Sequence, residues 1–331
     1  MSRAGQNCPI DCEKLSSHSE KLYYTTEMTT LQHTRQAAIQ PSPRKAQPAG
    51  GRHGSVTRPA QILILILCAL AAYSPARAQC SAPNTAFQSG ETLQYNLYFN
   101  WKFIWVKVGT ATMNITTTRY KGEPAYRAYL ITRGNKRADA LFMLRDTLTA
   151  HLTEELTPLH YRKHAHEGKN FYREDVTYSY PRGTCRLTQR YSRNFAPWEI
   201  QVYEDPECAF DMVSMLLRAR SFDPSHWKAG HRVEFTLAEG RKCRQEAIVF
   251  KGRDTFQQEG TGIRYRCLVF AFLEKKDGGK EKEIMRFYIT DDKNHLPVRL
   301  DMNLNFGTAK AYLAMGKGLR NPQTSIIKKK K

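Results

Sequence analysis

The chain has 331 residues, of which 41% are hydrophobic and 25% charged. This ordinary globular composition excludes a disordered protein and a protein with several membrane-spanning helices. Residues 79–331 hold 42 basic and 27 acidic side chains, which account for most of the formal net charge of +20. Such an excess favours anionic partners, namely phospholipid headgroups, lipopolysaccharide or acidic glycans. The alternative is that the basic surface only keeps the protein soluble.

An export signal is predicted at residues 58–78. Arg58 precedes an apolar run of eleven residues, and Ala76 and Ala78 place small residues at the two positions that signal peptidase reads. A spanning helix needs about 20 apolar residues, so the run is short for an anchor, although an uncleaved signal anchor is the alternative. We therefore expect cleavage after Ala78 and a periplasmic protein. Export also argues against a nucleic-acid partner.

The rest of the chain divides into three expected segments. Residues 1–57 do not fit in front of a signal, because its basic leader is normally short. We interpret them as a disordered extension or as the result of a translation start placed too early, with Val56 as a candidate for the true start. Residues 79–320 are expected to form a single exported β-rich domain. Residues 321–331 are expected to form a disordered basic tail, in which Lys328–Lys331 offer a contact to an anionic membrane surface.

Period-two alternation is the dominant pattern after the signal. Apolar side chains occupy every second position in residues 91–99, and aromatic residues continue the series as far as Trp105. Such alternation predicts half-buried strands, and many short strands with turns between them predict an all-β, mainly antiparallel fold: a sandwich or a curved, barrel-like sheet. Similar segments lie near 108–118, 125–133, 144–152, 157–165, 171–180, 184–191, 231–238, 243–250, 263–273, 284–290, 296–305 and 308–314.

One segment, residues 211–222, departs from this alternation. Its apolar residues recur at helical spacing, Asp211 is a suitable N-cap, and Pro224 ends the pattern. We expect one short amphipathic helix whose apolar stripe covers the sheet as part of the core. The alternative is a lid over a ligand cavity.

Six side chains are candidates for binding an apolar ligand. Aromatic residues of one parity in the first strand can line an apolar cavity, and methionines of the helix would cover it. Packing in an ordinary core is the alternative. Neither a cofactor nor a metal ion is expected. The candidates are Tyr95, Phe99, Trp101, Trp105, Met212 and Met215.

Five cysteines follow the predicted cleavage site, and an oxidising periplasm permits disulfides between them. Because five is odd, at least one thiol stays reduced or pairs with another chain. The sequence does not choose among the pairings. Nearness along the chain favours Cys185–Cys208 and Cys243–Cys267, which leaves Cys80 over. The absence of a CxxC motif removes the usual redox and zinc-ribbon signatures.

No motif in the sequence identifies a reaction. Nucleophile elbow, HExxH, Walker and dinucleotide-binding patterns are all absent. Asp139, Arg145 and Asp146 flank a short apolar run. We interpret them as a turn with a surface ion pair, and the alternative is a general acid and base with a steering cation.

Three histidines share parity on one predicted strand, so they lie on one face of it. No third-ligand partner for a metal ion follows from the pattern, and we interpret them as histidines on a solvated face. They are His160, His164 and His166.

Three of these segments carry a resemblance to a known family. Phe87–Ala111 has a GE-x-L-x-Y strand followed by V-G-x-A, Asp211–Arg220 reads DMVSMLLRAR, and Phe287–Leu313 contains D-D-x-x-x-x-P-V. In this order they resemble the exported bacterial family known as domain of unknown function 3108. The resemblance implies export and a domain that spans nearly the whole mature chain. It implies no activity.

Three functional hypotheses remain open. The first is a non-catalytic periplasmic domain that binds an apolar or amphipathic cell-envelope component, such as a lipid. The second is a hydrolase that acts on glycan or lipid through carboxylates such as Asp146 or Asp291. The third is an envelope assembly or protein-interaction factor whose sheet edge recruits a strand of a partner protein. An apolar cavity would favour the ligand-binding domain, and paired carboxylates in a cleft would favour the hydrolase. An unpaired sheet edge would favour the assembly or interaction factor.

The predicted signal gives a direct test. The mature protein should begin at Gln79, partly as pyroglutamate, because the cleavage site at Ala76 to Ala78 follows the apolar run. Peptide mass spectrometry of the secreted protein checks this. Recovery of peptides from residues 62–78 in the mature protein would contradict the prediction.

Overall fold

The computed structural model describes residues 80–101, 104–205, 207–258, 261–276, 278–304 and 307–327. The predicted signal peptide and the segment 1–57 lie outside the described residues. No described helix is long and apolar enough to cross a membrane.

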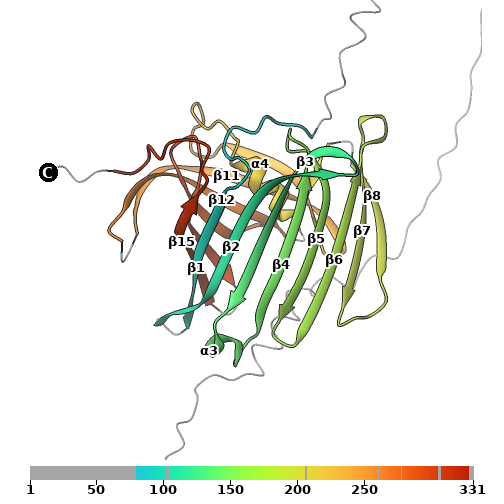
Figure 1. The fold of residues 1–331 in the computed structure, drawn as a ribbon, viewed down its shortest axis with the longest axis horizontal. Coiled ribbons are helices and arrows are strands. Elements are labelled where there is room, and N and C mark those ends of the chain that lie inside the picture. Colours follow the sequence, from blue (N-terminus) through green and yellow to red (C-terminus); the bar gives the residue numbers. More distant parts are fainter. Residues whose placement is uncertain are drawn as a thin grey trace, which may run out of the picture. The chain divides into compact units, whose positions relative to one another are not determined.

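The described residues form a single sheet of fifteen strands, as the alternation predicts (Figure 1). All neighbouring strands are antiparallel except β9, which runs parallel to β10. The strands are β1 (Thr92–Trp101), β2 (Ile104–Tyr120), β3 (Glu123–Gly134), β4 (Leu144–Leu152), β5 (Pro158–Glu167), β6 (Asn170–Ser179), β7 (Cys185–Arg193), β8 (Glu199–Asp205), β9 (Ala209–Phe210), β10 (Arg232–Glu239), β11 (Lys242–Gln257), β12 (Arg264–Lys275), β13 (Glu281–Thr290), β14 (Pro297–Leu304) and β15 (Gly307–Lys317).

The order of the strands puts the two ends of the domain in the middle of the sheet. It runs from β8 back to β1, continues through β15, and returns from β14 to β9. β1 therefore pairs with β15, while β8 and β9, which follow one another in the chain, form the two opposite edges. The chain crosses from one edge to the other within residues 205–209.

Both halves of the sheet are strongly curved. The Gln258 side-chain amide donates to the carbonyl oxygen of Leu313 at 2.8 Å, and the rings of Phe256 and Tyr312 stack 5.8 Å apart. β11 and β15 are separated by four strand spacings of about 4.8 Å each, so a flat sheet would hold these residues much farther apart. The β10–β11 turn likewise reaches the first half, where the Gly240 amide donates to Glu174 at 3.0 Å. This curvature confirms a barrel-like sheet.

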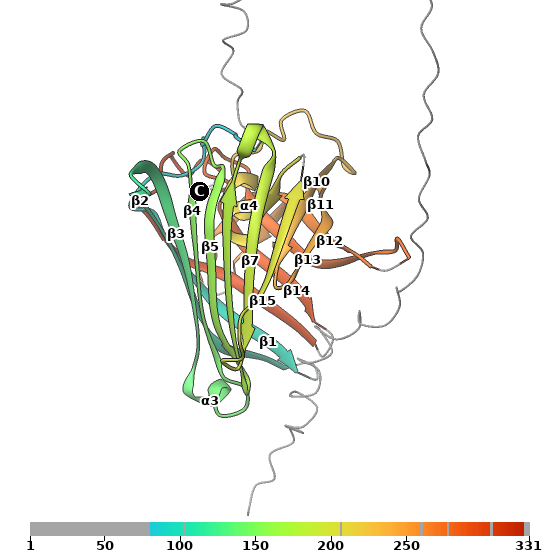
Figure 2. The same ribbon diagram turned by 90° about the vertical axis from the view of Figure 1, so that its right-hand side faces the viewer.

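The helices of the described residues are α3 (Lys136–Asp139), a 3₁₀ turn η1 (Pro181–Gly183) and α4 (Met212–Ala219). α4 confirms the predicted amphipathic helix, although it is shorter, and Asp211 caps it by accepting from the Ser214 amide at 2.9 Å. Figure 2 shows α4 between the two halves of the sheet, where it contacts β3, β4 and β10. Val213 and Leu217 belong to the larger apolar core and Met215 to a second one around Phe270. The helix thus joins two cores.

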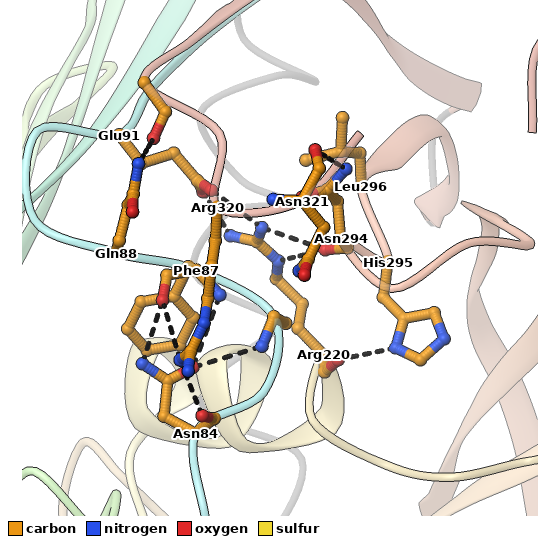
Figure 3. A network of polar contacts seen from close by, with 12 residues as sticks. Asn84, Phe87, Gln88, Glu91, Arg220, Asn294, His295, Leu296, Arg320 and Asn321 are labelled. Atoms are coloured by element: carbon orange, nitrogen blue, oxygen red, sulfur yellow. Dashed lines mark hydrogen bonds and ion pairs between the residues drawn. The ribbon is translucent and has the colours of Figure 1, made fainter. Parts of the chain in front are cut away.

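A buried ion pair fixes the end of this helix (Figure 3). The Arg220 guanidinium donates to both oxygens of Glu91, at 2.5 and 3.1 Å, and to the carbonyl oxygen of Asn294 at 3.0 Å. His295 Nδ1 donates to the carbonyl oxygen of Arg220 at 2.6 Å, which fixes the proton on that nitrogen. Phe87 lies under the guanidinium, 5.5 Å from its centre. The network joins α4, the start of β1 and the β13–β14 turn.

The disulfide prediction was wrong. Cys80 bonds to Cys208 across 128 residues, with Cα atoms 5.4 Å apart, and neither Cys185–Cys208 nor Cys243–Cys267 forms. Nearness along the chain misleads here because β strands bring distant residues together. The bond ties the start of the described chain to the crossing between β8 and β9.

Part of the expected disordered tail is hydrogen-bonded to β12. The Arg266 amide donates to Ser325 and the Ile327 amide donates to Arg264, so the tail runs beside β12 as far as Ile327. Lys328–Lys331 lie outside the described residues.

The buried ion pair should dominate the stability of the domain. Arg220→Met leaves the Glu91 carboxylate buried without its cation, and removal of one partner of such a pair costs about 3–5 kcal/mol. Urea unfolding measures the change in the free energy of unfolding. Arg232→Met is the matched control, because its exposed pair with Glu281 should contribute about 1 kcal/mol or less. Equal losses in the two variants would contradict the assigned role of Arg220.

Candidate binding cleft between the sheet edges

Of the six predicted ligand-binding residues, the five whose side chains are described lie in different surroundings. Tyr95 is buried in the larger core and Met215 in the second core. Met212 is exposed on α4, and Trp105 is exposed on β2 with the Lys310 ammonium 4.0 Å from its ring centre. Phe99 is half-buried, and the side chain of Trp101 lies outside the described residues.

Of the predicted acid–base candidates, Arg145 and Asp139 form the expected surface ion pair, and Asp139 accepts from the Leu144 amide and so closes the turn before β4. Asp146 is half-buried, and burial is the main cause that raises its pKa to about 7. Asp291 lies 3.7 Å from Arg253 at the surface. None of these carboxylates lines the cleft described below.

The three histidines occupy one face of β5, as their parity predicts. His160 Nε2 lies 3.2 Å from a carboxylate oxygen of Asp175, while the ring of Phe171 packs 6.2 Å from both His164 and His166. Within the described part of the chain, no group of three or more metal-ligating side chains is arranged to hold an ion.

The cleft lies elsewhere, where the two edges of the sheet approach each other. It has a volume of about 410 Å³ and a polar lining contributed by β8, the β8–β9 crossing and the strands β10 to β13. The lining residues are Tyr203, Glu207, Arg232, Glu234, Gln245, Glu246, Lys275 and Glu281. A cavity with these walls suits a polar or charged ligand rather than an acyl chain.

Two strand edges border this cleft. Among the described strands, β8 pairs only with β7. On the other side, β9 covers β10 only at Thr236 and Leu237, so the stretch of β10 from Arg232 to Phe235 has no described strand beside its outer edge. An uncovered edge presents main-chain donors and acceptors that another strand can pair with.

The cleft carries more acidic than basic groups. The Arg232 guanidinium donates to both oxygens of Glu281, at 2.6 and 3.1 Å, and lies 3.3 Å from Glu234. One arginine is therefore shared by two carboxylates. Glu246 is buried, and its Oε2 accepts from the Lys275 amide at 3.0 Å. Burial is the main cause that raises the pKa of Glu246 to about 7. Four glutamates, one arginine and one lysine line the cleft, so its acidic groups outnumber its basic ones.

β8, the strand that forms one wall of the cleft, is not among the strands predicted from the sequence. Its residues alternate, with Ile200 and Val202 paired opposite Arg190 and Thr188 of β7, and Gln201 and Tyr203 on the other face. Two β-branched residues in alternation were the available signal. The surrounding acidic residues and the short length concealed it.

The comparisons with known proteins point to one family. The model of the family described as protein of unknown function (DUF3108) matches residues 94–314. No curated protein matches the chain.

Two solved structures are similar at low sequence identity. One is a β-barrel-like protein from Brucella abortus, of domain of unknown function DUF1849, with 10% identity and a TM-score of 0.46 over 73% of this chain and 100% of that chain. The other is a protein from Bacteroides fragilis, described as exported and with a YmcC-like fold, with 10% identity and a TM-score of 0.29 over 72% of this chain and 98% of that chain.

The raised pKa of Glu246 predicts a pH dependence of stability. An unfolded glutamate titrates near about 4.3. Because the folded-state pKa is higher, the stabilising contribution is complete below the unfolded value and is lost as the pH rises through about 7. Between pH 5 and pH 8 this group should lower the free energy of unfolding by about 2–3 kcal/mol.

Glu246→Gln should remove that part of the dependence, because the amide does not ionise. Urea unfolding at both pH values measures the slope, and Glu154→Gln, an exposed turn residue, is the control. A Glu246→Gln slope that equals the slope of the parent protein would contradict the assignment.

Proposed function

We propose, from the premise that the chain belongs to the DUF3108 family of proteins of unknown function, that it is a non-catalytic protein-interaction domain of the cell envelope. It binds an extended, positively charged segment of a partner protein as an added strand along β8. The observation that carries the proposal is the edge of β8, which no described strand covers, beside an acidic cleft.

Main-chain pairing supplies the affinity in this mode of binding. A strand added to an exposed edge forms the same hydrogen-bond ladder as an internal strand, and alternate side chains give the specificity. β8 is seven residues long, which is enough for such a ladder. Natural edge strands are usually protected by lysine, proline or bulges. The edge of β8 has neither lysine nor proline, and it exposes Ile200 and Val202 on one face.

The acidic residues of β8 and of the cleft determine which partner strands can bind. β8 begins with Glu199 and ends with Glu204 and Asp205, and further carboxylates line the cleft. Antiparallel pairing of β8 with a second copy of itself about Val202 would place Glu199 opposite Asp205, and like charges directly opposite are destabilising. A partner strand should instead carry lysine or arginine on the face toward the cleft.

The disulfide supports the location of this domain outside the cytoplasm. Bonds such as Cys80–Cys208 form and persist in oxidising compartments and are rare in reducing ones. Cys80 directly follows Gln79, the expected first residue of the mature protein. The proposal therefore includes export through the predicted signal peptide.

Two rival functions receive less support. A carrier of an apolar ligand needs a cavity with apolar walls, whereas the cleft is polar and the candidate aromatic residues lie apart. A hydrolase is favoured by one observation, the raised pKa of Glu246, because a carboxyl group that is protonated near neutral pH can act as a general acid. However, its Oε2 is engaged by the Lys275 amide, and Arg232 holds the neighbouring Glu234 and Glu281.

The proposal predicts binding of a defined peptide. A fluorescein-labelled nine-residue peptide of alternating lysine and valine should bind the protein, and fluorescence anisotropy measures its Kd. At pH 8, where Glu246 is ionised, the double variant Glu234→Gln with Glu246→Gln should raise the Kd roughly tenfold, which corresponds to about 1.4 kcal/mol, because two negative groups leave the cleft.

Two controls separate strand pairing from simple charge attraction. Glu154→Gln with Glu155→Gln changes the net charge equally at the exposed β4–β5 turn and should leave the Kd unchanged. The same peptide with every second amide N-methylated keeps its charge but loses main-chain donors, so it should not bind. Equal binding of the methylated and unmethylated peptides would overturn the strand-addition model.

A further inference from the structure

We propose that the outer face of β5–β8 docks onto an anionic phospholipid surface, a binding activity that goes beyond the proposed capture of a partner strand. This surface, here called the arginine–aromatic surface, consists of Phe171, Arg173, Arg190, Phe195, Trp198, Ile200 and Val202. It is distinct from the cleft, which lies at the edge of β8 and not on this face.

The strand register places these residues on one face. His164 pairs with Arg173 and Arg173 with Ser192, while Arg190 pairs with Ile200. The opposite face of the same strands is buried, as Tyr161, Tyr172 and Leu187 show. The arginines and the aliphatic residues of β8 therefore project outward together.

Guanidinium groups and aromatic rings are interleaved on this surface. The ring of Trp198 lies between Arg173 and Arg190, whose guanidinium carbons are 4.6 and 4.7 Å from its centre. Arg173 also lies 5.3 Å from the ring of Phe195, which stacks on Phe171 at 4.9 Å. The aromatic contacts hold the two arginines in place. Among the ion pairs of the described residues, none joins Arg190 to a carboxylate.

The apolar residues at the rim of the surface are unusually exposed. Phe195 is 71% exposed at the tip of the β7–β8 connection, and Ile200 and Val202 are 60% and 54% exposed. Phe195 and Asn194 both have positive φ, 62° and 50°, a conformation that non-glycine residues seldom adopt. The turn thus exposes the Phe195 side chain to solvent and adopts an unfavourable backbone conformation to do so. Burial of this side chain in a membrane would offset that cost.

Charge complementarity identifies an anionic lipid surface as the occupant. This face carries Arg162, Arg173, Arg186 and Arg190 against the acidic residues Asp175 and Glu204. Arginine and aromatic side chains suit the headgroup region of a membrane, because each combines an apolar body with a polar end. Basic residues attract anionic lipids, and the exposed Phe195, Ile200 and Val202 would insert below the headgroups.

Sedimentation with sucrose-loaded vesicles tests the proposal. The purified protein should sediment with vesicles of phosphatidylglycerol and phosphatidylcholine in a ratio of 3 to 7, and it should not sediment with pure phosphatidylcholine. Binding should weaken as the salt concentration rises, since the attraction between exposed charges is screened. Two variants remove the surface: Phe195→Ser with Ile200→Ser, and Arg190→Glu. Each should lower the partition coefficient at least about tenfold.

Matched variants on another part of the molecule serve as controls. Ile104→Ser with Val106→Ser removes two residues of β2 that are 66% and 51% exposed, and Arg119→Glu makes the same change of charge on an exposed arginine. Both controls should bind vesicles like the parent protein, and circular dichroism should show that all variants are folded. Failure of the parent protein to bind anionic vesicles would overturn the proposal. Equal loss in Arg190→Glu and Arg119→Glu would also overturn it, because net charge alone would then explain binding. Peptide binding at the cleft is measured separately and does not depend on either outcome.

Discussion

The carboxylate of Glu91 and the guanidinium of Arg220 are buried together, and each group neutralises the charge of the other. Glu91 precedes β1, the strand at the middle of the sheet, and Arg220 follows α4, the helix between its halves. The same guanidinium holds the β13–β14 turn through the carbonyl oxygen of Asn294. A buried pair of this kind tolerates only one arrangement of the three segments, because any other leaves a charge without a partner in the interior. The strands can then curl around a helix whose position is fixed.

The position of the helix also explains why the sheet remains open. After β8 the chain leaves one edge, forms β9 at the opposite edge, and then forms α4 before it continues with β10. The disulfide between Cys80 and Cys208 fastens this crossing. The two edges lie near each other, but charged side chains lie between them. Among the described strands, no main-chain hydrogen-bond ladder joins β8 to the opposite edge, so the barrel is not closed. An acidic cleft bordered by strand edges is the consequence, and it is the feature from which the function is inferred.

Much of the architecture could be predicted from the sequence. Alternation identified most strands, because a curved sheet with one buried face imposes a period of two, and Asp211 marked the start of the only amphipathic helical pattern. The cleft could not be predicted, since it depends on which strands form the edges, and strand order is not a local property. β8 was missed because its acidic ends interrupt the apolar pattern. The aromatic residues of the first strand were predicted to share a cavity, but Tyr95 packs in the core while Trp105 lies at the surface. The disulfide prediction failed for a related reason, because pairing of strands brings together residues that are far apart along the chain.

The central claim is that an added strand occupies the edge of β8, and amide hydrogen exchange measures this directly. Amides at an uncovered edge exchange quickly because they lack a stable partner, and pairing with a new strand slows them. Hydrogen–deuterium exchange followed by mass spectrometry, with and without the alternating lysine–valine peptide, resolves the peptides that contain residues 199–205. The account predicts slower exchange in β8 on binding and unchanged exchange in β4 and β5. Bound peptide with unchanged exchange in β8 would contradict it.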